Sequence, residues 1–261
     1  MRSFINIGSI LGAFCLASAN VVLAGEPKPT IVLVHGAFAE SASWSGVMAD
    51  LIQDGFPVIA AANPLRSVSG DAAHVASVVG SVKGPVVLVG HSYAGAVISA
   101  IADQLPNVKA LVYVAAFEPD VGESSLELTG RFPGSTLGPT LAPPVNLANG
   151  EQDLYIQQDK FPAQFAADVP EVDARLMGAA QRPVNQAALA DRAVRAAWKT
   201  IPSWSIYGAA DRNIPPVAMA FMAERAHARK TVIVPGASHL VMVSHPGEVA
   251  ALIEDAANAE R

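Results

Sequence analysis

The sequence of 261 residues contains a single cysteine, Cys15. It lies in an N-terminal segment that we expect to be removed, so the mature chain is predicted to have no disulfide. Phe14 directly precedes it, whereas a lipoprotein processing site normally has a small residue at that position. Neither thiol chemistry nor lipid attachment through this cysteine is therefore expected in the mature protein.

Charged residues are scarce, and blocks of like charge are absent. They make up 15% of the chain, and the formal net charge is −6 at pH 7. Nucleic acids and anionic membrane surfaces are bound through basic patches, which this sequence lacks. Apolar residues make up 51% of the chain, which excludes a disordered protein and predicts one large domain with a substantial core.

The most hydrophobic stretch is at the N-terminus. Arg2 supplies a positive charge, residues 4–16 are mostly apolar, and small residues allow cleavage after Ala19 or Ala24. The segment is too short and too weakly flanked for a stable transmembrane helix, and a Gly- and Pro-containing stretch separates it from the rest. Residues 1–24 are therefore predicted to be a secretory signal peptide, which would make the protein secreted or periplasmic.

Short apolar runs alternate with helical patterns through most of the remaining chain. Nearly continuous apolar strands separated by helices predict an α/β protein whose mostly parallel sheet has helices on both faces. The expected helices cover residues 45–54, residues 71–82 and the stretch from Ser92 to about residue 105. The six expected strands are residues 30–34, 56–61, 85–90, 109–116, 203–207 and 231–234.

This alternation stops over residues 118–200. The first part is rich in Gly, Pro and Ser, and residues 151–199 suggest short helices separated by prolines. A long insertion between two sheet strands is often a lid over the site beneath it, and its apolar and aromatic content favours a packed cap over a poorly ordered excursion. We therefore predict a helical cap over residues 118–200 and a core formed by residues 25–117 and 201–261.

The strand at residues 86–89 leads directly into Gly-His-Ser-Tyr-Ala-Gly at residues 90–95. Small residues on both sides of Ser92 relieve crowding in a sharp strand-to-helix turn, the nucleophile elbow, which exposes a serine hydroxyl at the end of a sheet. The usual second glycine is replaced by Ala94, and Gly95 follows one residue later. An accidental Gly-x-Ser before an ordinary helix is the alternative interpretation.

A serine nucleophile needs a base, and the base needs a carboxylate that orients it. Asp211 lies in the loop after the strand at residues 203–207, and His239 lies in the loop after the last strand. Because the carboxyl ends of parallel strands share one edge, we expect both side chains to lie near Ser92. Glu118 and Asp120, which follow an earlier strand, are the alternative acids.

An acyl-transfer site also needs donors for the developing oxyanion. The N–H after the nucleophile, that of Tyr93, is one candidate, and the loop after the first strand offers Ala37, with Phe38 next. His35 and His91 flank the expected site, where we expect them to form hydrogen bonds within these loops. Phe38 and His91 are also the candidate substrate contacts.

Together these segments resemble the α/β-hydrolase superfamily, and in particular the branch that contains plant methyl-ester esterases, hydroxynitrile lyases and many bacterial hydrolases. The similarity covers residues 30–258 and is weakest in the cap. The motifs that carry it are Val34-His35-Gly36-Ala37, Trp44, the turn at residues 90–95, Asp211 and Ser238-His239. The resemblance implies the α/β-hydrolase fold, a triad of Ser92, His239 and Asp211, oxyanion donors Ala37 and Tyr93, a helical cap, and no cofactor or metal.

The expected function is that of a serine hydrolase acting on small-molecule carboxylic esters. The first alternative is hydroxynitrile-lyase-type cleavage by the same triad, which would favour a cation near the site; in the cap only Lys160 and Lys199 are lysines. The second is a ligand-binding homologue with low turnover. A serine at the nucleophile position argues against dehalogenase and epoxide hydrolase activity, which use an aspartate on this fold. The sequence does not predict an oligomeric state.

Overall fold

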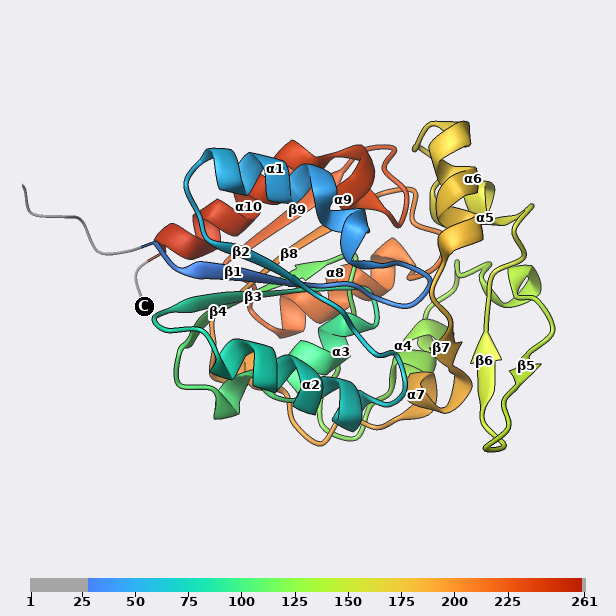
Figure 1. Ribbon diagram of the computed structural model, residues 1–261, viewed down its shortest axis with the longest axis horizontal. Coiled ribbons are helices and arrows are strands. Elements are labelled where there is room, and N and C mark those ends of the chain that lie inside the picture. Colours follow the sequence, from blue (N-terminus) through green and yellow to red (C-terminus); the bar gives the residue numbers. More distant parts are fainter. Residues whose placement is uncertain (1–27, 260–261) are drawn as a thin grey trace, which may run out of the picture.

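The computed structural model describes residues 28–259, so the predicted signal peptide over residues 1–24 lies outside the described residues. A parallel sheet of six strands forms the centre, as predicted, and the structure gives the strand order as β2-β1-β3-β4-β8-β9 (Figure 1). Its strands are β1 (Thr30–Val34), β2 (Val58–Ala61), β3 (Val86–His91), β4 (Val108–Val114), β8 (Ser203–Gly208) and β9 (Lys230–Val234).

The register aligns the carboxyl ends of the central strands. Gly90 of β3 pairs with Val34 of β1 on one side and with Tyr113 of β4 on the other. The loops that follow these three strands therefore begin at one level of the same sheet edge, which is where ligand sites form in parallel α/β sheets.

Helices cover both faces of the sheet, as predicted (Figure 1). One face carries α1 (Ser45–Gln53) and α10 (Pro246–Asn258), and the other carries α2 (Val68–Gly80), α3 (Ala94–Ser99) and α8 (Pro216–Arg225). The short α9 (Val241–Ser244) precedes α10. Among the described residues, no helix has the length and apolar character needed to cross a membrane.

Helix α3 is shorter than the sequence pattern predicts. It ends at Ser99, and a 3₁₀ turn over Ala102–Gln104 follows. The chain tightens there, because the Ile101 N–H bonds the Ile98 carbonyl only three residues earlier. Leu105 is then extended, as expected for a residue that precedes a proline.

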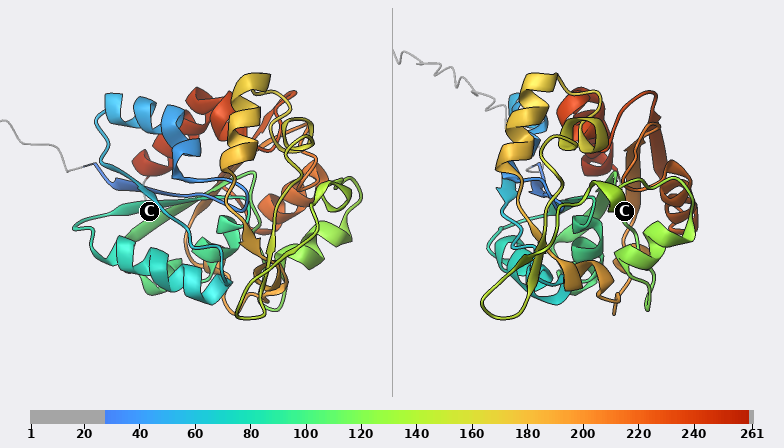
Figure 2. Two further views of the ribbon diagram at one scale, coloured as in Figure 1. Left: turned by 45° about the vertical axis from the view of Figure 1, so that its right-hand side comes forward. Right: turned by 90° about the vertical axis from the view of Figure 1, so that its right-hand side faces the viewer.

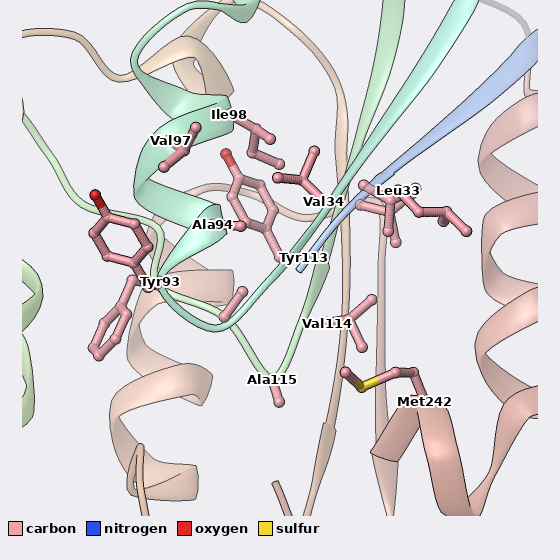
Figure 3. Close-up of a cluster of buried hydrophobic side chains, with 14 of the residues drawn as sticks. Leu33, Val34, Tyr93, Ala94, Val97, Ile98, Tyr113, Val114, Ala115 and Met242 are labelled. Atoms are coloured by element: carbon pink, nitrogen blue, oxygen red, sulfur yellow. The ribbon is translucent and has the colours of Figure 1, made fainter. Parts of the chain in front are cut away.

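Helix α3 packs tightly on the sheet through small side chains. Figure 3 shows Ala94 and Ile98 beside Tyr113 of β4, whose hydroxyl lies 2.7 Å from Ser99 Oγ of α3. A Cβ atom added to Gly95 would lie 2.1 Å from the Phe117 carbonyl oxygen. Close packing therefore requires glycine at position 95, whereas Ala94 fits into the buried interface.

The inserted segment, residues 118–200, lies across the carboxyl edge of the sheet (Figures 1 and 2). It contains short helices, as predicted, but also a three-stranded antiparallel sheet, which the sequence did not predict. Strands of two or three residues are too short to produce a recognisable alternation of apolar and polar side chains. Its elements are α4 (Ser125–Arg131), a 3₁₀ turn (Gly138–Thr140), β5 (Val145–Asn146), β6 (Gln152–Leu154), α5 (Phe161–Phe165), α6 (Glu171–Ala180), β7 (Val184–Asn185), α7 (Gln186–Ala190) and a second 3₁₀ turn (Ala197–Lys199).

Candidate active site

Ser92 occupies a strained turn directly after β3. Its φ is +54°, in the left-handed region that non-glycine residues seldom adopt. Its N–H donates to the Val114 carbonyl at 3.2 Å, and its own carbonyl accepts the Phe117 N–H at 3.2 Å. The end of β4 thus holds this conformation, as expected for a nucleophile elbow.

The loop after β1 approaches this turn very closely. A Cβ atom on Gly36 would lie 2.6 Å from both the His91 carbonyl oxygen and Ser92 Cβ. Only glycine allows the two backbones to come so near. Gly36 in the loop after β1 is therefore explained by its contact with the turn at Ser92.

Three of the predicted site residues form one hydrogen-bonded chain. His239 Nε2 lies 2.9 Å from Ser92 Oγ, and His239 Nδ1 lies 2.6 Å from Asp211 Oδ2. Ser92, His239 and Asp211 are 7%, 1% and 4% exposed, respectively. A hydroxyl, an imidazole and a carboxylate in this order can move a proton from the hydroxyl to the ring while the carboxylate orients the ring.

Backbone donors and close loop packing hold the carboxylate of Asp211. Its Oδ1 accepts the N–H groups of Asn213 at 2.7 Å and Ile214 at 3.1 Å, which leaves Oδ2 for the imidazole. A Cβ atom on Gly208 would lie 2.1 Å from the Ala237 carbonyl oxygen. The loops after β8 and β9 can therefore lie side by side only because β8 ends in glycine.

The alternative acids lie elsewhere. Glu118 is fully buried, and among residues 28–259 its carboxyl oxygens accept neither a backbone N–H nor the imidazole of His239. Burial raises the pKa of Glu118 to about 8, although a hydrogen bond from Ser205 and the charge of Arg225 oppose the shift. Asp120 pairs with Lys199 at 2.5 Å. Within the described chain, the ring nitrogens of His239 therefore bond neither of these acids.

His91 connects two site loops and does not line the cavity, in contrast to the substrate contact predicted for it. Its Nδ1 accepts the Gly36 N–H at 3.4 Å, so Nε2 carries the proton and donates to the His239 carbonyl at 3.2 Å. Burial, together with the neighbouring His239, holds the pKa of His91 well below its ordinary value. The neutral ring thus bridges the loops after β1 and β9.

His35 also forms hydrogen bonds within its loop, as predicted. Its Nε2 accepts the Asn63 N–H at 3.0 Å, and its Nδ1 donates to the Gly36 carbonyl at 3.0 Å. Burial lowers the pKa of His35 to about 4, with a smaller contribution from Arg182. The ring is therefore neutral at physiological pH and fixes the start of the loop.

The predicted oxyanion donors lie beside Ser92. Ala37 and Tyr93 both line the cavity around Ser92, and neither backbone N–H has an acceptor within residues 28–259. Phe38 is different, because its N–H donates to the Arg182 carbonyl at 3.0 Å. Its backbone is therefore not available as a donor, while its side chain lines the cavity as a substrate contact would.

The side chain of Tyr93 is anchored to α2 through its hydroxyl. Its hydroxyl donates to Asp71 Oδ2 at 2.9 Å, and Asp71 Oδ1 accepts the Arg66 N–H at 3.1 Å. Burial raises the pKa values of both Tyr93 and Asp71. The turn that carries the Tyr93 N–H is thus attached to α2.

A cavity of about 830 Å³ lies between the sheet edge and the inserted segment, with Ser92 and His239 in its wall. None of the described residues that line it is Asp, Glu, Lys or Arg. Its larger apolar lining residues include Phe117, Leu126, Leu137, Leu141, Pro143, Pro144, Leu154, Phe165, Leu189 and Ile214. Within residues 28–259, no group of three or more His, Cys, Asp or Glu side chains could hold a metal ion.

The residues of the inserted segment that contact the site loops were not predicted from the sequence. Gln164 hydrogen-bonds Asn213, Phe165 packs against His239, and Asp168 hydrogen-bonds Ser238. These partners are separated by many tens of residues along the chain. No motif marks them, although the position of Ser238 directly before His239 could have drawn attention to it.

Comparisons with known proteins agree with this fold. A family model described as the alpha/beta hydrolase family matches residues 31–252. A carbendazim-hydrolyzing esterase from Nocardioides sp. (strain SG-4G) is 34% identical over 113 residues, which are 37% of this chain and 46% of that protein. Polyneuridine aldehyde esterase superposes with a TM-score of 0.76 at 19% identity, covering 87% of this chain and 98% of that one. An Arabidopsis methylesterase superposes with a TM-score of 0.70 at 18% identity and the same coverage.

Proposed function

The chain belongs to the alpha/beta hydrolase family, and on this basis we propose that it is a serine hydrolase that cleaves carboxylic esters. The observation that carries the proposal is the hydrogen-bonded chain from Ser92 through His239 to Asp211 in the wall of an apolar cavity. The similarity to a named esterase supports it, although the match spans about half of that protein.

In the acylation step, Ser92 Oγ attacks the ester carbonyl carbon while His239 Nε2 takes the hydroxyl proton. Asp211 holds the Nδ1–H side of the ring and stabilises the imidazolium that forms. The carbonyl oxygen becomes an oxyanion, which accepts the N–H groups of Ala37 and Tyr93. Collapse of this intermediate breaks the ester bond, and His239 delivers its proton to the departing alcohol.

Deacylation repeats the same steps with water. His239 takes a proton from a water molecule, whose oxygen attacks the acyl carbon on Ser92. The oxyanion forms at the same two N–H groups, the acyl bond to Ser92 breaks, and the proton returns to Oγ. The products are a carboxylic acid and an alcohol.

The cavity indicates which esters fit. A volume of about 830 Å³ lies in the range of pockets that enclose drug-sized molecules. An uncharged lining cannot pair a charged substituent, and burial of an unpaired charge is strongly unfavourable. We therefore propose neutral esters with sizeable apolar groups as the substrates.

Two other functions have less support. A hydroxynitrile lyase would favour a cation near the departing cyanide, and neither Lys160 nor Lys199 lines the cavity in the described part of the chain. A ligand-binding homologue with low turnover would keep the same hydrogen-bonded chain. A covalent serine probe distinguishes this second case, because it would label Ser92 in a protein that lacks measurable turnover.

Hydrolysis of p-nitrophenyl acetate, butyrate, hexanoate and octanoate tests the proposal. We expect kcat/KM to rise with acyl length. For an ester whose acyl chain ends in a carboxylate, we expect kcat/KM to be about 10²-fold lower, because the charge stays unpaired. Ser92→Ala should lower kcat by more than about 10⁴-fold. Ser135→Ala is the matched control, since Ser135 also lines the cavity. A folded wild-type protein without turnover on any ester would contradict the proposal.

A further inference from the structure

Residues 164–168, which are the end of α5 and the chain directly after it, form a short stretch that contacts both loops that carry the later residues of the site. At its start, Gln164 Nε2 donates to the Arg212 carbonyl at 2.9 Å and to Asn213 Oδ1 at 3.1 Å. Asn213 Nδ2 donates in return to the Gln164 carbonyl at 3.1 Å. Arg212 and Asn213 directly follow Asp211, so the inserted segment is attached to the loop of the acid.

At its end, this chain is attached to the loop of the base. Asp168 Oδ1 accepts the Ser238 N–H at 3.0 Å and also the Ser238 hydroxyl. The other carboxyl oxygen lies 3.5 Å from His245 Nδ1. Burial tends to raise the pKa of Asp168, but the hydrogen bonds from Ser238 and Ser244 outweigh it and hold the pKa below its ordinary value.

Between these two attachments, Phe165 packs against the imidazole of His239. The ring centroids are 4.9 Å apart with an interplanar angle of 63°. Phe165 also makes edge contacts with His91 and Phe38. The base is therefore held by its two hydrogen bonds, by this aromatic contact and by the loop that Asp168 binds.

We propose that Asp168 is a positioning residue, which aligns His239 between Ser92 and Asp211 by holding Ser238. The inference rests on the proposed ester hydrolysis. Ser238 is joined to His239 by one peptide bond, and a single carboxylate satisfies both of its donors. Catalytic groups need placement within about 0.5 Å, so release of these donors would let the loop move enough to disturb the proton transfer.

The same contact makes the geometry of the site depend on the inserted segment. Ser92, Asp211 and His239 all come from the core, but residues 164–168, at the end of α5 and directly after it, hold two of their three loops. Correct docking of this segment over the sheet edge therefore has a catalytic consequence in addition to enclosing the substrate.

The test compares three variants in turnover of the best p-nitrophenyl ester. Asp168→Ala should lower kcat by about 10-fold to 100-fold, with KM changed less than about 2-fold, because misplacement affects the chemical step. Asp168→Asn retains an oxygen acceptor and should restore most of the activity. Asp191→Ala is the matched control, since Asp191 Oδ2 also accepts a core N–H, that of Val68 at 2.9 Å, and not an N–H of the loops that carry Asp211 and His239.

A spectroscopic measurement separates positioning from stability. The proton between His239 Nδ1 and Asp211 should give a low-field ¹H NMR signal, which we expect to shift or broaden in Asp168→Ala only. If Asp168→Ala does not fold, Ser238→Ala removes one of the two donors and should lower kcat severalfold. Unchanged kcat and unchanged signal in the folded variant, or equal losses in Asp191→Ala, would overturn the inference.

Wild-type behaviour distinguishes this failure from failure of the proposed function. A wild-type protein without ester turnover contradicts the function, and the NMR signal alone then tests the positioning by Asp168. Turnover that depends on Ser92 but is unaffected by Asp168→Ala contradicts only the positioning.

Discussion

The loops after β4 and β8 each bring a buried acid to the carboxyl edge of the same sheet, yet the two acids have opposite surroundings. Asp211 accepts two backbone N–H groups and the imidazole of His239. Glu118 accepts no backbone N–H on either carboxyl oxygen within the described chain, and burial raises its pKa to about 8 against the opposing effects of Ser205 and Arg225. A position after a strand therefore makes an acid a candidate, and its neighbours decide what it does.

Backbone contacts explain the difference. The Glu118 N–H lies 3.2 Å from Met222 Sδ, and the Glu118 carbonyl accepts Arg225 Nη2 at 2.8 Å. Both partners belong to α8, so this loop is attached to that helix. The loop of Asp211 instead packs against the loop after β9, as the close approach at Gly208 requires, and this loop carries His239.

The largest effect that would separate the two acids is on catalysis. Asp211→Asn should lower kcat by about 10⁴-fold, because the amide can donate to Nδ1 and thereby favour the wrong tautomer of His239. Glu118→Gln should leave kcat within about 3-fold, since Glu118 does not contact the imidazole. Steady-state kinetics on the same ester, with folding checked by circular dichroism, measures both.

A large loss in Glu118→Gln together with a small loss in Asp211→Asn would reverse the assignment. It would mean that Glu118, the acid after β4, orients the imidazole of His239 during turnover.

The next effect is on stability as a function of pH. The Glu118 carboxyl has an ordinary pKa of 4.5 and a folded pKa of about 8. Between these values the unfolded chain is ionised and the folded chain is protonated, so the group reduces the free energy of unfolding as pH rises from 4.5 to 8. The Glu118→Gln variant lacks this pH-dependent loss. Its free energy of unfolding, relative to that of the wild type, should therefore rise by a few kcal/mol between pH 4.5 and pH 8.

Urea unfolding at pH 5 and pH 8 measures the effect. The quantity to compare is the free energy of unfolding of the variant minus that of the wild type, taken at each pH. Its change between the two pH values gives the effect, because any constant cost of the buried amide cancels. A difference that is independent of pH would show that Glu118 is ionised in the folded protein.

The smallest effect concerns Asp120, the other alternative acid. Its partner Lys199 is 49% exposed in its side chain, and ion pairs at such positions contribute less than about 1 kcal/mol. Lys199→Ala should therefore change the free energy of unfolding by less than about 0.5 kcal/mol and leave kcat unaltered. Thermal unfolding and ester turnover check this, and a clear loss of activity would indicate that this surface pair matters to the site.

Residue types and spacing were enough to predict the parallel sheet, its six strands and the loops that carry Ser92, Asp211 and His239. Each of these features leaves a local pattern: continuous apolar runs mark buried strands, and glycine beside a serine marks the sharp turn. The parallel direction of the strands then brings their carboxyl ends to one edge. These signals are local in the sequence, and they do not depend on contacts with distant residues.

Other features depended on contacts between distant residues. The choice of Asp211 over Glu118 rests on which neighbouring loop each backbone meets, and the bridge from His91 to His239 spans 148 residues. The hydrogen bonds of Gln164 and Asp168 to the site loops also leave no local pattern in the sequence. The same is true of the short antiparallel sheet. Tertiary structure decided these points, because hydrogen bonds and burial depend on which groups come together in space and not on the residues beside them in sequence.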